Sequence, residues 1–222
     1  ISSSFSEAYL EKEIISLLHK NQITDGARVR LSVFRNTGGY YTPSSSETSF
    51  LIETKPLEEN YYLLNVRGLS IDIYEEQKKH TNKLNSIKSA NALIYVLAGI
   101  WKQEKGMDDC ILLNDTGNIA EATGSNVFVV FNGVFYTPSI NQGCIPGVMR
   151  QNIISLLKKQ GSEVQECPLN ANALLRADEV FFTNVINGIQ WVGAYKMKRY
   201  FNNACRVLVE RLNKIVEEKI PY

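Results

Sequence analysis

Residues 117–150 read GNIAEATGSNVFVVFNGVFYTPSINQGCIPGVMR, and this stretch contains the strongest local structural signals in the chain. Two short apolar runs flank Asn132 and Gly133, and Asn-Gly between such runs is a strong signal for a β-hairpin. Gly147 is followed by a helical pattern over 148–161 that has a basic last turn and ends at a glycine. We therefore predict a strand hairpin followed by a loop and a helix.

The segments on either side of this stretch predict a mixture of strands and helices. Clean alternation in RVRLSVFR predicts a strand over 28–35, and Ser6 before a helical pattern predicts a helix over 7–20. Further strands are predicted over 49–54, 61–66, 110–114 and 179–183, and a final amphipathic helix over 204–220. Strands outnumber helices and occur in adjacent runs, which favours the α+β class over a doubly wound sheet.

The distribution of polar residues predicts two domains. We expect a small N-terminal α+β domain over 1–74, a polar linker over 75–85, and a larger domain over 86–222. The chain begins ISSSFSEAYL without a methionine, so we expect the N-terminal domain to lack its first segment.

Composition limits the class of protein. The chain has 222 residues, of which 44% are hydrophobic and 21% charged, and its formal net charge is +1. This charge gives no reason to expect nucleic acid or a membrane as partner. Four widely spaced cysteines and two histidines suggest neither a metal site nor a disulfide framework, so we expect a cytoplasmic protein.

Residues 86–106 read SIKSANALIYVLAGIWKQEKG, and Lys88 is followed by no other charge until Lys102. Apolar residues at helical spacing predict a mostly buried helix with an ammonium group at its N-terminal end. A lone lysine at a helix start is usually solvated. Burial behind an apolar helix would instead favour the neutral, reactive amine.

Three other stretches contain polar groups at places suited to a binding site. Glu121 is a lone carboxylate among small and apolar residues, and the first amides of the helix after Gly147 point at an anion. Thr183, Asn184 and Asn187 follow a predicted buried strand. A lysine, an isolated carboxylate and a helix N-terminus are the parts that pyridoxal phosphate needs, although the residues alone leave this one possibility among several.

The region from Ile87 to Ile189 resembles the class IV aminotransferases, which are fold-type IV pyridoxal-phosphate enzymes. IKSAN over 87–91 resembles the segment around that family's Schiff-base lysine, and ADEVFFTN over 177–184 resembles its segment at the last core strand. The family signature is matched by Glu121, Thr123, Asn126, Val127, Phe128, Thr137, Gly147, Val148 and Arg150. The resemblance implies the two-domain, D-amino-acid aminotransferase-like fold with the cofactor between the domains.

The resemblance also implies roles for individual residues. Lys88 would be the catalytic Schiff-base lysine, with Lys83 as a competitor that lacks the sequence context, and Glu121 would contact the pyridine nitrogen with support from Ser125. The remaining cofactor-binding positions are Gly147, Val148, Met149, Asn184 and Val185. Arg30 falls near the position where the family's small domain has a group that binds the substrate carboxylate. The arginine that binds the phosphate is expected upstream of residue 1.

Three departures from the family pattern bear on the reaction. Met149 and Val185 stand where many aminotransferases have threonines, and Ala92 stands where branched-chain enzymes have a tyrosine. These departures favour 4-amino-4-deoxychorismate lyase, which forms pyruvate and 4-aminobenzoate in folate synthesis, over a branched-chain or D-amino-acid aminotransferase. A non-catalytic binding protein of the same fold is a remote alternative. The family also implies a small-molecule amino substrate and a homodimer with a shared active site.

Overall fold

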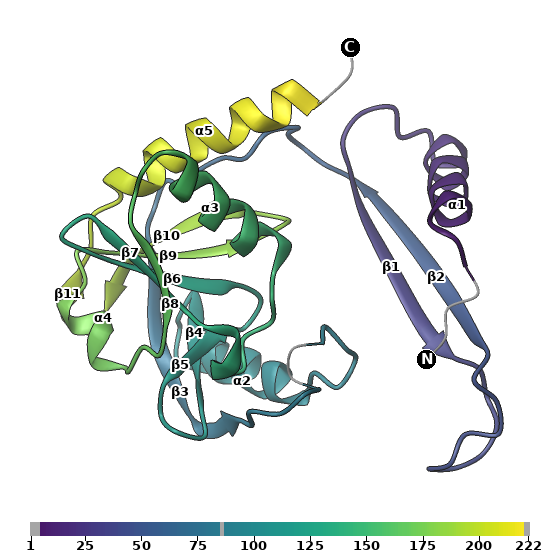
Figure 1. Cartoon of the computed structure of the whole chain (residues 1–222), viewed down its shortest axis with the longest axis horizontal. Coiled ribbons are helices and arrows are strands. Elements are labelled where there is room, and N and C mark those ends of the chain that lie inside the picture. Colours follow the sequence, from purple (N-terminus) through teal and green to yellow (C-terminus); the bar gives the residue numbers. More distant parts are fainter. Residues whose placement is uncertain (1–4, 85–86, 220–222) are drawn as a thin grey trace. The chain divides into compact units, whose positions relative to one another are not determined.

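The structure is a computed structural model that describes residues 5–84 and 87–219, and it divides the chain into two compact units, Ile1–Asn60 and Tyr61–Tyr222 (Figure 1). In the N-terminal unit, helix α1 (Glu7–Lys20) packs beside the antiparallel pair β1 (Ala27–Arg35) and β2 (Thr48–Pro56). The Ser6 hydroxyl accepts a hydrogen bond from the Tyr9 amide at 3.2 Å and caps α1. The helix predicted over 7–20 is confirmed.

The C-terminal unit is built on one mixed sheet, whose strands are ordered β5-β4-β3-β10-β9-β6-β7-β8, with β11 paired to β10. The strands are β3 (Leu69–Lys79), β4 (Asp109–Asn114), β5 (Ile119–Ala122), β6 (Asn126–Phe131), β7 (Val134–Pro138), β8 (Val164–Cys167), β9 (Glu179–Asn184), β10 (Gly188–Tyr195) and β11 (Lys198–Arg199). The helices are α2 (Leu93–Glu104), the short 3₁₀ helix η1 (Ile140–Gln142), α3 (Val148–Lys159), α4 (Asn172–Arg176) and α5 (Asn203–Lys219). The predicted α+β class is confirmed.

The predicted hairpin is formed by β6 and β7, with Asn132 and Gly133 at positive φ in the turn. Alternate residues of β6 face two different cores. Val127 belongs to a core that includes Leu174 of α4, and Phe128 belongs to a core with α3 and α5. The Phe128 ring stacks on Phe181 of β9, with centroids 4.9 Å apart. Both faces of this part of the sheet are therefore buried, as its continuous apolar run indicates.

The structure divides the chain earlier than the predicted boundary at residue 74. β3 pairs with both β10 and β4, so it lies in the middle of the large sheet, and the first residues of the predicted 75–85 linker belong to it. The segment predicted as a strand over 61–66 is irregular, because the Asn213 side chain of α5 bonds both the amide and the carbonyl of Tyr62. The predicted start of the large domain at residues 85 and 86 lies outside the described residues.

Helix α2 differs from its prediction in two ways. It begins at Leu93, so Lys88 precedes the helix, and only Ala98 of its residues is fully buried, against Tyr74 and Leu112. Four apolar side chains on α2 are 41–66% exposed: Leu93, Val96, Leu97 and Ile100. The prediction of a mostly buried helix is wrong within this unit, because the sheet covers one side of a helix that is apolar around most of its circumference.

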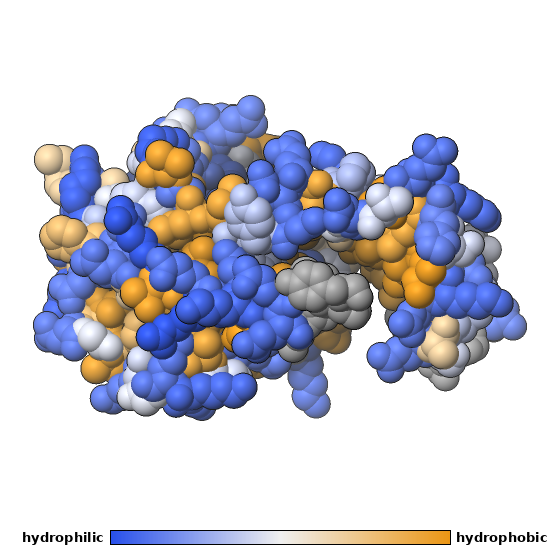
Figure 2. Space-filling model, turned by 90° about the horizontal axis from the view of Figure 1, so that it is seen from above, coloured by the Kyte–Doolittle hydropathy of each residue, from blue (hydrophilic) through white to orange (hydrophobic). Residues whose placement is uncertain are grey.

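Apolar residues also reach the surface elsewhere in each unit, as Figure 2 shows for one face. Among the described residues, no helix combines the length and apolar character that a membrane span requires.

Candidate active site

The Glu121 carboxylate is the centre of a buried polar cluster. Glu121 lies on β5 opposite Leu112 of β4, and it is 3% exposed. Its Oε1 atom accepts hydrogen bonds from the Lys79 ammonium and from the Tyr95 hydroxyl, the latter at 2.6 Å. Its Oε2 atom accepts one from the Ile145 amide at 2.9 Å. A buried carboxylate is thus compensated by one cation and two neutral donors.

Each donor comes from a different element of the C-terminal unit. Lys79 ends β3, Tyr95 lies in the first turn of α2, and Ile145 lies in the loop between η1 and α3. Burial and the Glu121 charge raise the pKa of Tyr95, so its hydroxyl stays protonated and donates. In the same region, burial raises the pKa of the Cys144 thiol to about 11, so this thiol is neutral at physiological pH.

A cavity of about 320 Å³ lies beside this cluster. Its lining includes Lys79, Tyr95 and Ile145, which all bond Glu121, and also Ile87, Ser89 and Asn91 from the segment before α2. Lys88 stands between two of these lining residues, and it is exposed. The structure therefore places Lys88 at a segment that borders the cavity, whereas the lysine in contact with Glu121 is Lys79.

The N-terminus of α3 is the second feature of the site. Gly147 is its N-cap and has no side-chain cap, and the first amides of any helix lack intrahelical acceptors. Val148 is exposed, whereas the Met149 side chain is buried in the core with Phe128. A Cβ atom on Gly147 would collide with Oδ1 of Asn126, whose amide donates to the Ile145 carbonyl at 2.8 Å. This close approach explains the glycine.

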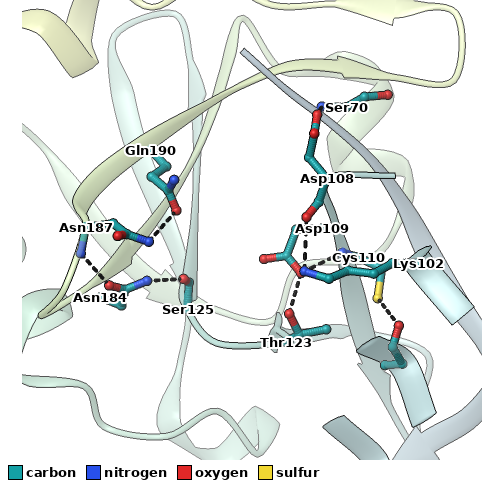
Figure 3. A network of polar contacts seen from close by, with 11 residues as sticks. Ser70, Lys102, Asp108, Asp109, Cys110, Thr123, Ser125, Asn184, Asn187 and Gln190 are labelled. Carbon is teal, nitrogen blue, oxygen red and sulfur yellow. Dashed lines mark hydrogen bonds and ion pairs between the residues drawn. The ribbon is translucent and has the colours of Figure 1, made fainter. Parts of the chain in front are cut away.

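Ser125 and the loop after β9 form the third feature (Figure 3). The Asn184 side chain donates a hydrogen bond to the Ser125 hydroxyl at 2.8 Å. Its Oδ1 atom accepts hydrogen bonds from the amides of Ile186 and Asn187. Val185, in the same loop, is 53% exposed. The structure thus brings the predicted residues Ser125 and Asn184 together. Thr183 beside them has a buried hydroxyl without a hydrogen-bond partner among the described residues.

A separate polar network fixes the turn between Glu121 and Ser125 (Figure 3). The Thr123 hydroxyl donates to Asp109 Oδ1 at 2.5 Å, and Lys102 of α2 contacts the same oxygen at 3.3 Å. Lys102 also donates to the Asp108 carbonyl at 3.0 Å. Thr123 therefore ties the turn to β4 and α2 and holds its two neighbours in place.

Arg150, the basic residue of the signature, is a structural residue in this fold. Its side chain is 2% exposed and donates to the Pro138 carbonyl at 2.8 Å and to Glu166 at 2.7 Å, joining α3 to β7 and β8.

Replacing Arg150 with alanine is expected to lower the free energy of unfolding by about 3 kcal/mol, because a buried side chain and its hydrogen bonds are lost. Urea denaturation followed by circular dichroism measures this value. Glu166→Gln is the milder control, since Glu166 is 40% exposed and the bond to Pro138 remains. An Arg150→Ala protein as stable as the Glu166→Gln protein would contradict the structural role.

Arg30 lies in the N-terminal unit, where it forms an ion pair with Glu53 at 3.6 Å. Both side chains are more than half exposed, so the pair contributes little to stability. The substrate-binding role of Arg30 stays a prediction.

Sequence reasoning missed three contacts of Glu121. The sequence predicts that Lys79 lies in the polar linker over 75–85, because the charged run after Tyr74 hides the end of a strand. The sequence patterns assign no role to Tyr95, although it lies three residues after Ala92, about one helical turn further along. The Ile145 amide could not be found, because backbone donors leave no mark on the sequence.

Comparisons with known proteins agree with this fold. The family model for class IV amino-transferases matches residues 1–195. The chain belongs to the class IV aminotransferase family.

Individual relatives have different names within this family. A "Putative branched-chain-amino-acid aminotransferase" of Methanocaldococcus jannaschii is 40% identical over 120 residues, covering 54% of this chain and 38% of that protein. A D-alanine aminotransferase of Bacillus licheniformis is 31% identical over 191 residues, covering 83% of this chain and 64% of that protein. The chain thus spans less than two thirds of the length of either relative.

The solved structure of a "Putative 4-amino-4-deoxychorismate lyase" from Legionella pneumophila superposes with a TM-score of 0.83 and 25% identity, covering 96% of this chain and 79% of that one. The fold is therefore the fold-type IV architecture that the sequence predicted.

Proposed function

We propose that the protein is a pyridoxal-phosphate enzyme that transfers an amino group from an amino acid to a 2-oxo acid. The observation that carries this proposal is the buried Glu121 carboxylate beside the cavity, within a chain of the class IV aminotransferase family. The fit of the cofactor is supported by the uncapped first turn of α3 and by the buried hydroxyl of Thr183, which has no hydrogen-bond partner within residues 5–84 and 87–219. These groups offer a carboxylate and several donors, as an aromatic nitrogen base with a phosphate requires.

The chain's own residues have distinct roles in this proposal. Glu121 would hold the protonated ring nitrogen, and the amides of Val148 and Met149 would bind the phosphate, with Gly147 allowing the close packing of this turn. The Ser125–Asn184 pair would fix the turn beside Glu121 and the loop that contains Val185. Lys88 would bond the cofactor and move the proton at the substrate α-carbon. When bound, the cofactor supplies an electron sink for that carbon.

Two lysines compete for the covalent role, and the contacts of Lys79 favour Lys88. The ring nitrogen and the aldehyde carbon lie at opposite ends of the pyridine ring. Lys79 contacts the carboxylate that would hold the nitrogen, so it stands at the wrong end for the aldehyde. Lys88 lies between the cavity-lining residues Ile87 and Ser89, and a long lysine side chain can reach into the cavity from this segment.

For the reaction, the comparisons support amino-group transfer better than the lyase reading that the sequence favoured. The relatives named above are branched-chain and D-alanine aminotransferases, whereas one solved structure carries the lyase name. The absence of threonine side chains at Met149 and Val185 is compatible with transfer, because the backbone amides of the uncapped first turn of α3 remain as donors.

The full-length protein loaded with pyridoxal phosphate tests this function. We expect a visible absorption band that borohydride bleaches, and transfer of the amino group from a branched-chain L-amino acid or D-alanine to 2-oxoglutarate. Aminodeoxychorismate supplied without an acceptor is the second arm. Release of pyruvate in that arm would establish the lyase instead, and a colourless protein that takes up no cofactor would exclude both.

A homodimer with a shared site forms part of this proposal. The exposed apolar side chains of α2, Leu93, Val96, Leu97 and Ile100, give an apolar surface suited to a second copy. Sedimentation of the full-length protein measures its mass, and a monomer at micromolar concentration would contradict this part.

A further inference from the structure

The contacts of Glu121 distribute unevenly over its two oxygens. An ionised carboxylate offers about four acceptor positions, two on each oxygen. Among the residues that the structure describes, Oε1 accepts from both Lys79 and Tyr95, whereas Oε2 accepts from the Ile145 amide alone. One acceptor position therefore remains, and it lies on Oε2.

We infer that Lys79 is a positioning residue that, together with Tyr95, occupies Oε1 of Glu121 and so leaves Oε2 to receive the cofactor's ring nitrogen, while its positive charge weakens that contact. This inference rests on the function proposed above. Lys79 acts through Glu121 and is not itself assigned to the reacting atoms.

The burial of this ion pair gives Lys79 a strong influence on Glu121. Both side chains are 4% exposed, so water screens their interaction poorly. Lys79 is the charged donor, whereas Tyr95 and the Ile145 amide are neutral. A second cation on the same carboxylate meets a like charge nearby, which costs free energy in a site of low dielectric constant. The pair thus stabilises the protein without cofactor and opposes the binding of a protonated ring.

The effect of Lys79 on stability and its effect on cofactor binding have opposite signs. This difference distinguishes the proposed role from simple packing. Removing the charge of Lys79 leaves Glu121, among its described partners, with the neutral donors Tyr95 and the Ile145 amide, so the cofactor-free protein should lose stability. The protonated ring nitrogen then becomes the only cation on the carboxylate, so the affinity for the cofactor should rise. A lysine that served only to support the fold would lower both quantities when replaced.

The test uses the full-length protein and its Lys79→Met, Lys79→Arg and Tyr95→Phe variants. Two quantities are measured for each: the urea midpoint without cofactor, and the dissociation constant for pyridoxal phosphate by absorbance titration. We expect Lys79→Met to unfold at lower urea and to bind the cofactor about tenfold more tightly. Lys79→Arg keeps the charge and should return both values toward wild type. Tyr95→Phe should lower the urea midpoint without tightening binding, because it removes a neutral donor. Lys105→Met, a change at an exposed lysine, controls for net charge.

Unchanged or weaker cofactor binding by Lys79→Met overturns the inference, and weaker binding would assign Lys79 to the cofactor itself. If Lys79→Arg has the same urea midpoint and the same dissociation constant as Lys79→Met, the charge of Lys79 is not the cause of the changes. If the wild-type protein takes up no cofactor, the proposed function fails, and the urea midpoints still report whether the Lys79–Glu121 pair stabilises the fold.

Discussion

Full-length protein in which Lys88 is replaced by alanine is expected to form no borohydride-stable cofactor adduct and to transfer amino groups about 10³-fold more slowly. The reason is the loss of the amine that bonds the cofactor and carries the proton at the substrate α-carbon. Mass spectrometry of the reduced protein measures the adduct, and a coupled assay for the 2-oxo acid product measures the rate.

Two further lysines provide the controls for this result. Lys83→Ala changes the competitor named from the sequence and should keep the adduct and the rate. Lys79→Met should keep the adduct, because Lys79 contacts Glu121 at the opposite end of the ring. An adduct that persists in Lys88→Ala and disappears in either of these variants would assign the covalent role to the other lysine.

Replacing Glu121 with glutamine is expected to have the second large effect. The buried Lys79 ammonium loses the negative charge of its partner, so the free energy of unfolding without cofactor should fall by about 3 kcal/mol. Turnover should also fall by about 10²–10³-fold, because a neutral amide does not stabilise a protonated ring nitrogen. Urea denaturation and the transfer assay measure these two quantities.

A double variant and a second buried carboxylate sharpen this test. In Lys79→Met/Glu121→Gln the ion pair is removed as a unit, so the double variant should be more stable than Glu121→Gln alone. Glu179→Gln changes another buried carboxylate, which accepts the Ala204 amide at the start of α5, and it should leave the cofactor spectrum unchanged. Equal stability of Glu121→Gln and of the double variant would show that Glu121 does not compensate the buried charge of Lys79.

Much of the fold could be predicted from local signals. Asn132 and Gly133 encode the β6–β7 turn, and the capping Ser6 and the start at Gly147 mark helices that the structure contains. The domain boundary could not be predicted from the sequence, because the exposed polar residues at 75–78 and the buried Lys79 form the end of a central strand. Polarity distinguishes solvent from core, but it does not distinguish a linker from the end of a strand.

Residues of the candidate site that belong to sequence motifs could be predicted. Residues that reach the site only through tertiary contacts could not. Glu121, Ser125, Gly147 and Asn184 were identified from the sequence, and the structure brings Ser125 and Asn184 into contact. Lys79 reaches Glu121 only because β3 and β5 flank β4 in the same sheet. Such a pairing depends on strand order, which one sequence without relatives does not reveal.

Lys88 is therefore the lysine that we expect to bond the cofactor, whereas Lys79 contacts Glu121. The direct test is to load the full-length protein with pyridoxal phosphate, reduce it with borohydride, digest it, and locate the modified lysine by mass spectrometry. We expect a single modified peptide that carries the adduct on Lys88. An adduct on Lys79 or Lys83, or no adduct at all, would contradict it.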